Sequence, residues 1–317
     1  MLRSLVKRSL PYLPQSVRSI VRGHAETIRR KEHQERKQRV QVPVEEIIAK
    51  IKRLGVDRDV MVHASISNIG KLDKPVPALV NDLLALMDLS RQTVLVPALP
   101  FATTMLEYAA STRTFDVRTA KNAMGVVSQV IGRQPGSIRS LHPTHSAIAI
   151  GKDAAFYTAD HEKDPTPFGA NSPYAKLVRR RGQILLIGVT VNSTTTFHVH
   201  EDMLGAASPI QVYSPGTITF TLVGFDGQSQ EYQAVCHDSR LSARRDPNLF
   251  RQWLEAAGAI RFSPIGEAEV AVVDAHLMTK TCLQRLREGR SLYGRVSVDA
   301  KHKAAIDAAL ERLESDT

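Results

Sequence analysis

The chain has 317 residues, of which 43% are hydrophobic, 5% aromatic and 23% charged, and its formal net charge is +10. This length and hydrophobic content can build one large α/β domain or two small ones. The scarcity of aromatic residues argues against a stacking surface for single-stranded nucleic acid. We find no run of about 18 apolar residues and no signal-peptide core, so we expect neither a membrane-spanning nor a secreted protein.

The positive charge is concentrated near the N-terminus. The first 55 residues hold 14 Lys and Arg against 5 Asp and Glu, whereas the rest of the chain is nearly balanced. We therefore divide the chain into a basic arm over residues 1–43 and a folded domain over residues 44–317. Because the folded domain is nearly neutral, we expect no nucleic-acid partner. Apolar residues at helical spacing in the arm suit loose contact with an anionic membrane surface or docking on a partner. We favour the simpler alternative, a solvated extension that packs on a neighbouring subunit of a homo-oligomer. A third interpretation is an organelle transit peptide, because the start of the chain is poor in acidic residues.

The two cysteines, Cys236 and Cys282, show no paired spacing. This pattern indicates neither a disulfide framework nor a zinc ribbon and favours a reducing compartment. The expected location is the cytoplasm, and the basic arm leaves the inner face of a membrane open as an alternative.

Strands and helices alternate along the predicted domain. Apolar residues at helical spacing predict a helix over 44–54, which Gly55 ends as a C-cap. Buried strands are predicted at 59–63, 93–97, 147–151, 183–188 and 268–273, and further helices at 75–87, 126–132, 173–181, 247–257, 275–288 and 298–314. Alternating segments at 217–222 and 230–235 flank an Asp-Gly turn and predict a β-hairpin. This order is typical of an α/β protein.

A Thr-rich turn after the strand at 183–188 leads into a predicted helix that carries the main candidate site. Either Thr195 or Thr196 is the expected N-cap. His198, Glu201 and Asp202 then lie at positions i, i+3 and i+4 on one helical face, while His200 points away. This grouping of an imidazole with carboxylates suits a base held in a chosen tautomer.

Three interpretations compete for this stretch. In the first, His198 is a general base for acyl transfer, and Glu201 or Asp202 orients it. In the second, His198, His200 and Asp202 form the metal site of a metal-dependent hydrolase. In a helix the side chains of His198 and His200 point in different directions, which weakens this interpretation. Met203 also occupies the position where such sites usually have another His. In the third, the histidines are ordinary residues with satisfied hydrogen bonds.

Two further loops stand out. Residues 64–70 form a small-residue loop after a strand, where exposed backbone N–H groups hold phosphate or pyrophosphate in many proteins; an ordinary βα turn is the alternative. Residues 134–146 are rich in Pro, Gly, Ser and His. A simple connection between two elements does not need so many turn-forming and polar residues, so this composition favours a functional loop. A Gly-x-Ser-x-Gly elbow and a well-placed Cys are both lacking, which disfavours covalent catalysis.

Several motifs occur in an order that resembles one known family. In chain order they are Val62-His63-Ala64-Ser65-Ile66-Ser67-Asn68-Ile69-Gly70, Val96-Pro97, Phe115-Asp116, Met124-Gly125, residues 135–146, Gly169-Ala170-Asn171-Ser172-Pro173, residues 185–189 and Thr196-Phe197-His198-Val199-His200-Glu201. Across residues 45 to 290 the sequence is similar to the aminoglycoside 3-N-acetyltransferases. Together with the order of elements, the resemblance implies a single large α/β domain with a central mixed sheet flanked by helices in three layers, and a small β-hairpin region after the catalytic helix.

The resemblance implies transfer of acetyl from acetyl-CoA, as co-substrate, to a primary amine in one ternary complex, without a metal. The family's His-x-x-Glu motif falls on His198 and Glu201, the implied base and its orienting partner. The residues implied to line the acetyl-CoA cleft are His63, Ala64, Ser65, Ile66, Ser67, Thr103, Met124, His142 and Ser146, and Asp116 and Asp202 are the candidate substrate contacts.

The sequence departs from the family in two places. Residues 120–123 replace a Thr-Pro-Ser, and Ala64 replaces the first Ser of a Ser-Ser pair. A pocket for a polycationic aminoglycoside is expected to present several carboxylates, whereas this chain places Lys121 near the cleft. We therefore expect a small-molecule amine acceptor that is an amino sugar, either aminoglycoside-like or nucleotide-linked as in polysaccharide assembly. A metal-dependent hydrolase and a non-catalytic family member stay open as alternatives.

Overall fold

The computed structural model describes Glu35 and residues 39–315. Most of the predicted basic arm lies outside the described residues, so its contacts and the domain boundary at residue 44 stay predictions. In the described part, strand β1 (Gln41–Val42) pairs with β3 (Lys71–Leu72) just before helix α3 (Val44–Leu54). No helix in this part of the chain is long and apolar enough to cross a bilayer.

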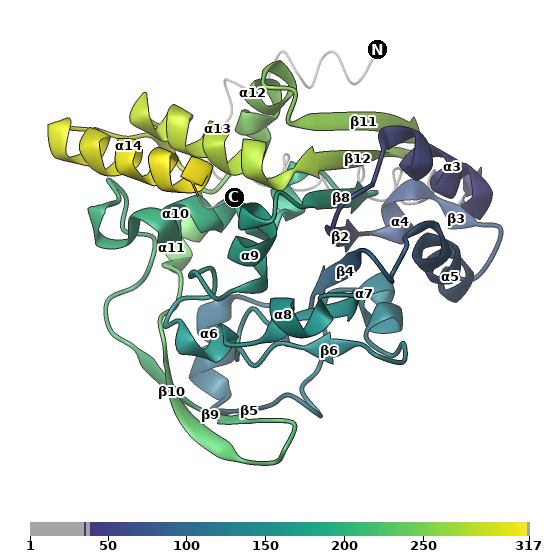
Figure 1. Cartoon of the computed structure of the whole chain (residues 1–317), viewed down its shortest axis with the longest axis horizontal. Helices are drawn as coiled ribbons and strands as arrows, with labels where there is room; N and C mark the ends of the chain where they lie inside the picture. The colour runs from purple at the N-terminus through teal and green to yellow at the C-terminus, as the bar shows by residue number, and fades with distance from the viewer. Residues whose placement is uncertain (1–34, 36–38, 316–317) are drawn as a thin grey trace, which may run out of the picture.

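The main sheet is mixed, as predicted. Within the described ranges, seven strands form it in the order β11-β12-β8-β2-β4-β7-β6 (Figure 1). Strand β2 runs parallel to β4 and β8, and the other neighbouring pairs are antiparallel. The bounds are β2 (Val60–Ala64), β4 (Thr93–Pro97), β6 (Ile138–Arg139), β7 (Ala147–Gly151), β8 (Gln183–Ile187), β11 (Ile260–Ile265) and β12 (Ala268–Asp274).

Helices cover both faces of the sheet and produce the predicted three layers. Successive residues of a strand point to opposite faces, so Met61 and Ile184 pack into one core while Val60 and Leu185 pack into the other. The second core is covered by α3, α4 (Ile66–Ile69), α5 (Val76–Leu86) and α7 (Val126–Ile131). The first is covered by α8 (Ala154–Thr158), α9 (Pro173–Arg179), α10 (Val199–Leu204), α12 (Arg251–Ala256), α13 (Ala275–Arg287) and α14 (Ala300–Ser315).

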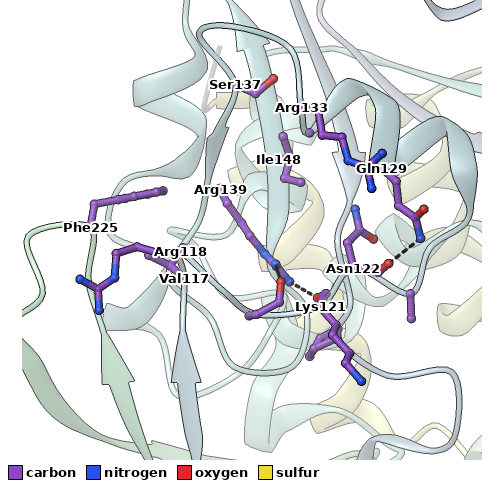
Figure 2. Close-up of a pocket in the computed structure, with 14 residues that line it drawn as sticks. Val117, Arg118, Lys121, Asn122, Gln129, Arg133, Ser137, Arg139, Ile148 and Phe225 are labelled. Atoms are coloured by element: carbon purple, nitrogen blue, oxygen red, sulfur yellow. Dashed lines mark hydrogen bonds between the residues drawn. The ribbon is translucent and has the colours of Figure 1, made fainter. Parts of the chain in front are cut away.

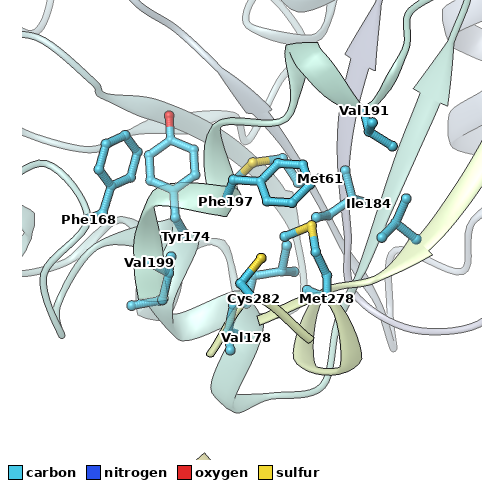
Figure 3. Close-up of a cluster of buried hydrophobic side chains, with 14 of the residues drawn as sticks. Met61, Phe168, Tyr174, Val178, Ile184, Val191, Phe197, Val199, Met278 and Cys282 are labelled. Carbon is cyan, nitrogen blue, oxygen red and sulfur yellow. The ribbon is translucent and has the colours of Figure 1, made fainter. Parts of the chain in front are cut away.

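Large side chains fill the first core behind the candidate site. Figure 3 shows Phe197, Tyr174 and Met278 gathered there with Cys282. Cys282 and Cys236 are both buried free thiols, and burial raises the pKa of each. A thiol held protonated in this way is a poor nucleophile.

The predicted hairpin is present and belongs to a separate minor lobe. Strands β9 (Ile218–Val223) and β10 (Ser229–Ala234) pair antiparallel, and β5 (Thr114–Asp116) joins β9 in parallel. With α6 (Met105–Ser111), they enclose a small core that includes Phe115 and Phe220. In Figure 1 this lobe projects below the main sheet.

The structure differs from the predicted elements in several places, and α6 and α8, for example, were not predicted. Strand β11 (Ile260–Ile265) was not predicted, because it is an edge strand whose exposed Arg261 and Pro264 break the apolar pattern. The loop at 64–70 contains one helical turn, α4, which begins directly after Ser65. The helix from Ser172 is confirmed: the Ser172 hydroxyl accepts a hydrogen bond from the Ala175 N–H at 3.1 Å.

We predict that Gly188→Ala destabilises the protein more than its backbone angle alone explains. Gly188 follows β8 with φ of +68°, and an added Cβ would lie 2.5 Å from the Ser65 carbonyl oxygen. A left-handed residue with a Cβ costs about 1–2 kcal/mol. Gly258→Ala is the matched control, since its φ is +65° but no described heavy atom lies within 4 Å of the added Cβ. Urea titrations should show a larger loss of unfolding free energy for Gly188→Ala than for Gly258→Ala. Equal losses would contradict the close approach of Gly188 to the Ser65 carbonyl oxygen.

Candidate active site

The candidate site is built where β8 ends. The chain passes through two short 3₁₀ turns, η3 (Val191–Ser193) and η4 (Thr195–His198), and then enters α10. The predicted cap at Thr195 or Thr196 is wrong: η4 starts at Thr195, and Thr194 before it makes no capping side-chain bond. The tighter 3₁₀ turn takes the place of the first α-helical turn.

His198 and Glu201 form a close pair on one face of the turn, as the spacing predicted. The His198 Nδ1 lies 2.7 Å from the Glu201 Oε2, and their side chains are 12% and 4% exposed. The Tyr293 hydroxyl also hydrogen-bonds to Glu201. When Glu201 is ionised, Nδ1–H donates to it and the Nε2 lone pair is left free.

Asp202 and His200 face other partners. The Asp202 carboxylate accepts hydrogen bonds from the Phe168 N–H at 3.1 Å and from the Tyr213 hydroxyl at 2.6 Å. Burial raises the pKa of Asp202 to about 6. The His200 Nδ1 bonds to the carbonyl oxygen of Phe197. The metal set of His198, His200 and Asp202 is therefore wrong, because these side chains do not converge.

Three residues that the sequence did not single out complete the surroundings of His198. The Phe168 ring stacks on His198 with centroids 5.0 Å apart, and the His237 ring lies 4.6 Å away. The Arg245 side chain is half-buried nearby, and its guanidinium donates to the carbonyl oxygens of Asn192 and Thr194. Each is an isolated residue in sequence, so no motif could have revealed it.

The electrostatics of the site keep the imidazoles neutral. Burial lowers the pKa of His198 well below its usual value, and the Arg245 charge lowers it further. The same two causes lower the pKa of His63 to about 4. Burial raises the pKa of Glu201. A neutral His198 at physiological pH has a lone pair available to accept a proton.

A metal ion could be held here by a different set of residues from the predicted one. Among the described residues, one ligand atom each from His198, Glu201 and His237 lie within 4.8 Å of one another. The His237 Nε2 is buried without a hydrogen-bond partner in this part of the chain. Two histidines and a carboxylate are a donor set that zinc accepts.

Part of the predicted acetyl-CoA cleft is brought together around a narrow cavity of about 260 Å³. His63, Ala64 and Met124 line it, together with Ser193 from η3. Ser65, Ile66 and Ser67 follow Ala64 directly in the chain but do not line the cavity. α4 begins after Ser65, whose N–H donates to the carbonyl oxygen of Ile187. The parallel strands β2 and β8 thus present their C-terminal ends at the same place.

The other predicted residues lie elsewhere. Thr103 is exposed beside the start of α6. His142 is buried against His161 and Tyr232, and Ser146 is buried with its hydroxyl donating to the Ala98 carbonyl oxygen. Asp116 forms an ion pair with Arg118 at 2.7 Å in the minor lobe.

The chain is an α/β protein that carries a close His198–Glu201 pair beyond the end of a central strand of its main sheet. The model of the aminoglycoside 3-N-acetyltransferase family matches residues 61–287, and the chain belongs to this family.

Relatives and solved structures agree with this assignment. Aminoglycoside N(3)-acetyltransferase VII of Streptomyces paromomycinus is 40% identical over 83 residues, which is 26% of this chain and 28% of that protein. Aminoglycoside N(3)-acetyltransferase III of Serratia marcescens is 27% identical over 221 residues, which is 62% of this chain and 76% of that protein. The crystal structure of aminoglycoside acetyltransferase AAC(3)-IIb superposes with a TM-score of 0.63 and 25% identity, over 78% of this chain and 97% of that one. AAC-IIIb, solved as a binary complex with CoASH, gives a TM-score of 0.64 and 24% identity over the same shares.

The buried histidines predict how stability depends on pH. His161 and His237 have pKa values lowered by burial to about 3, so the unfolded chain binds protons below about pH 6.5 while the folded chain does not. Stability should therefore fall on acidification from about pH 6.5 to about pH 4, by roughly 1.4 kcal/mol per pH unit per such histidine. Asp202 acts in the opposite direction, because its raised pKa makes the folded chain bind a proton more readily than the unfolded chain. Its contribution offsets part of the loss of stability on acidification. Urea unfolding at several pH values checks this; His161→Asn should reduce the slope, and an unchanged slope would contradict it.

Proposed function

We propose that the protein is an N-acetyltransferase that moves acetyl from acetyl-CoA to a primary amine of an amino sugar, in one ternary complex. Membership of the family supports acetyl transfer to an amine. The observation that carries the mechanism is the buried His198–Glu201 pair with its free Nε2. Neither cysteine is suited to form a covalent acetyl intermediate, because burial raises the pKa of both thiols.

In the proposed mechanism the acceptor amine attacks the thioester carbonyl carbon directly. The new N–C bond forms while His198 Nε2 accepts a proton from the amine nitrogen. The tetrahedral intermediate then breaks its C–S bond, and coenzyme A leaves as a thiolate that takes up the proton from His198 Nε2, which returns the imidazole to its neutral form. Glu201 holds Nδ1–H and stabilises the imidazolium that forms.

The narrow cavity beside His63 suits the pantetheine arm of acetyl-CoA. It lies where β2 and β4 end, and Ala64 and Met124 give it walls of small and flexible side chains. The His63 Nε2 is buried with no hydrogen-bond partner among the described residues, so it could contact the thioester end. AAC-IIIb, which shares the fold, was solved with CoASH. Thr103, His142 and Ser146 do not line this cavity.

The acceptor is an amino sugar in this proposal. Neighbours of the same fold were solved with sisomicin and with a gentamicin, both bound by those proteins. Of the two predicted substrate carboxylates, Asp116 is paired with Arg118 and Asp202 with Tyr213. Neither is free to bind an ammonium group without losing its partner, so a polycationic acceptor is not favoured.

We predict that His198→Ala lowers turnover by about two to four orders of magnitude while acetyl-CoA affinity is nearly kept. A thiol-release assay measures turnover and calorimetry measures affinity. His302→Ala is the matched control, because His302 also lies 2.8 Å from a carboxylate three residues away, Asp299, but on the surface of α14. Turnover close to that of the unaltered protein in His198→Ala would exclude His198 as the base.

We predict activity on amino sugars in a panel that contains aminoglycosides and nucleotide-linked amino sugars. The thiol-release assay with acetyl-CoA reports each acceptor. Activity on nucleotide-linked sugars supports our preference, and activity confined to aminoglycosides would contradict it. Failure to bind acetyl-CoA in calorimetry would instead indicate a non-catalytic family member.

A further inference from the structure

A second, larger cavity of about 650 Å³ lies between the edge of the main sheet and the minor lobe (Figure 2). We call it the basic cavity, because every charged side chain that lines it is cationic: Arg118, Lys121, Arg133 and Arg139. It shares Ala123 with the narrow cavity beside His63, so the two lie next to each other. A volume in this range is typical of a small-molecule site.

Arg139 is a buried cation without a counter-ion. Its side chain is 9% exposed, and its guanidinium donates to the carbonyl oxygens of Ala98, Ala120 and Lys121 and to the Ser146 hydroxyl. No carboxylate of the described chain pairs with it. Burial lowers its pKa to about 10, so it is still charged at neutral pH. Neutral partners compensate a buried charge only in part, and an anion in the cavity would complete the compensation.

Two more cations at this cavity are unpaired. Lys121 and Arg133 are exposed, and neither forms an ion pair within the described ranges. Arg118 differs, because Asp116 neutralises it at 2.7 Å. Figure 2 shows Arg133 and Gln129 on one wall and the Arg139 guanidinium held against the backbone at Lys121. Since Arg139 binds the carbonyl oxygens of Ala120 and Lys121, it also fixes the segment that carries the Lys121 ammonium.

We propose that the basic cavity binds the phosphate groups of a nucleotide-bearing substrate of the acetyl transfer. This inference rests on the proposed function and deepens it by naming the substrate class. Guanidinium groups bind phosphate oxygens in pairs of hydrogen bonds, and Lys adds a point charge. Phe225 lines the cavity at the hairpin tip, is 58% exposed, and offers an aromatic face to a nucleobase. A polycationic aminoglycoside would be repelled from the same walls.

The phosphate groups have two sources. One is the nucleotide end of coenzyme A, whose pantetheine arm would continue into the adjoining narrow cavity. The other is the diphosphate of a nucleotide-linked amino sugar, whose amine is the acceptor in the proposed function. Both place a phosphate-bearing group in the basic cavity, and a binding experiment distinguishes them.

Calorimetry on the full-length protein tests the inference with three probes: coenzyme A, phosphate-free pantetheine and UDP. The test variant is Lys121→Glu with Arg133→Glu, and Lys121→Ala with Arg133→Ala repeats it without reversing charge. The matched control is Arg91→Glu with Lys301→Glu, two exposed cations outside the lining of the basic cavity. Thermal unfolding shows that each variant is folded.

We expect the test variants to bind at least one phosphate-bearing probe about tenfold more weakly or worse, with pantetheine binding unchanged and the control like the unaltered protein. A loss for coenzyme A assigns the cavity to the co-substrate, and a loss for UDP assigns it to the acceptor. Both results support the inference. Unchanged binding of both probes, or no binding of either by the unaltered protein, would overturn it. UDP bound without any affinity for coenzyme A would contradict the proposed function and leave the cavity inference standing.

Discussion

The site depends on one constraint, the removal of His198 from water. Phe168 stacks on its ring, His237 lies beside it, and Arg245 adds a positive charge nearby. In water an imidazole is half protonated near pH 6.5, and a protonated ring accepts no proton. Burial shifts the equilibrium toward the neutral form, and Glu201 then determines which nitrogen carries the remaining hydrogen.

The fold supplies this burial through two neighbouring parallel strands. β8 leads into the turn that carries His198, and its neighbour β2 carries His63, which pairs in register with Leu186 of β8. The C-terminal ends of these two parallel strands therefore lie side by side. Gly188 permits the sharp departure from β8, because its φ of +68° and its contact with the Ser65 carbonyl leave no room for a Cβ. The large side chains of the first core close the site from behind.

Sequence reasoning reached the local parts of this arrangement and missed those that depend on tertiary contacts. Helical spacing grouped His198 with Glu201 and Asp202, and the family resemblance selected Glu201 as the partner. Apolar runs located most of the main strands. The pattern could not show that a 3₁₀ turn replaces the N-capped start of the helix, or that Asp202 turns to Tyr213. His237 and Arg245 reach the site from beyond the hairpin, and only the folded chain brings them there. Of the cations that line the basic cavity, the sequence pointed only to Lys121. Arg133 and Arg139 stood out by no pattern in the sequence.

The protonation state of His198 tests the central claim most directly. ¹⁵N NMR of the full-length protein labelled at histidine reports each ring nitrogen, and a His198→Gln variant assigns the signals. We expect a neutral ring with its hydrogen on Nδ1 and a bare Nε2 from about pH 6 to about pH 8. An imidazolium at neutral pH, or a hydrogen on Nε2, would contradict it.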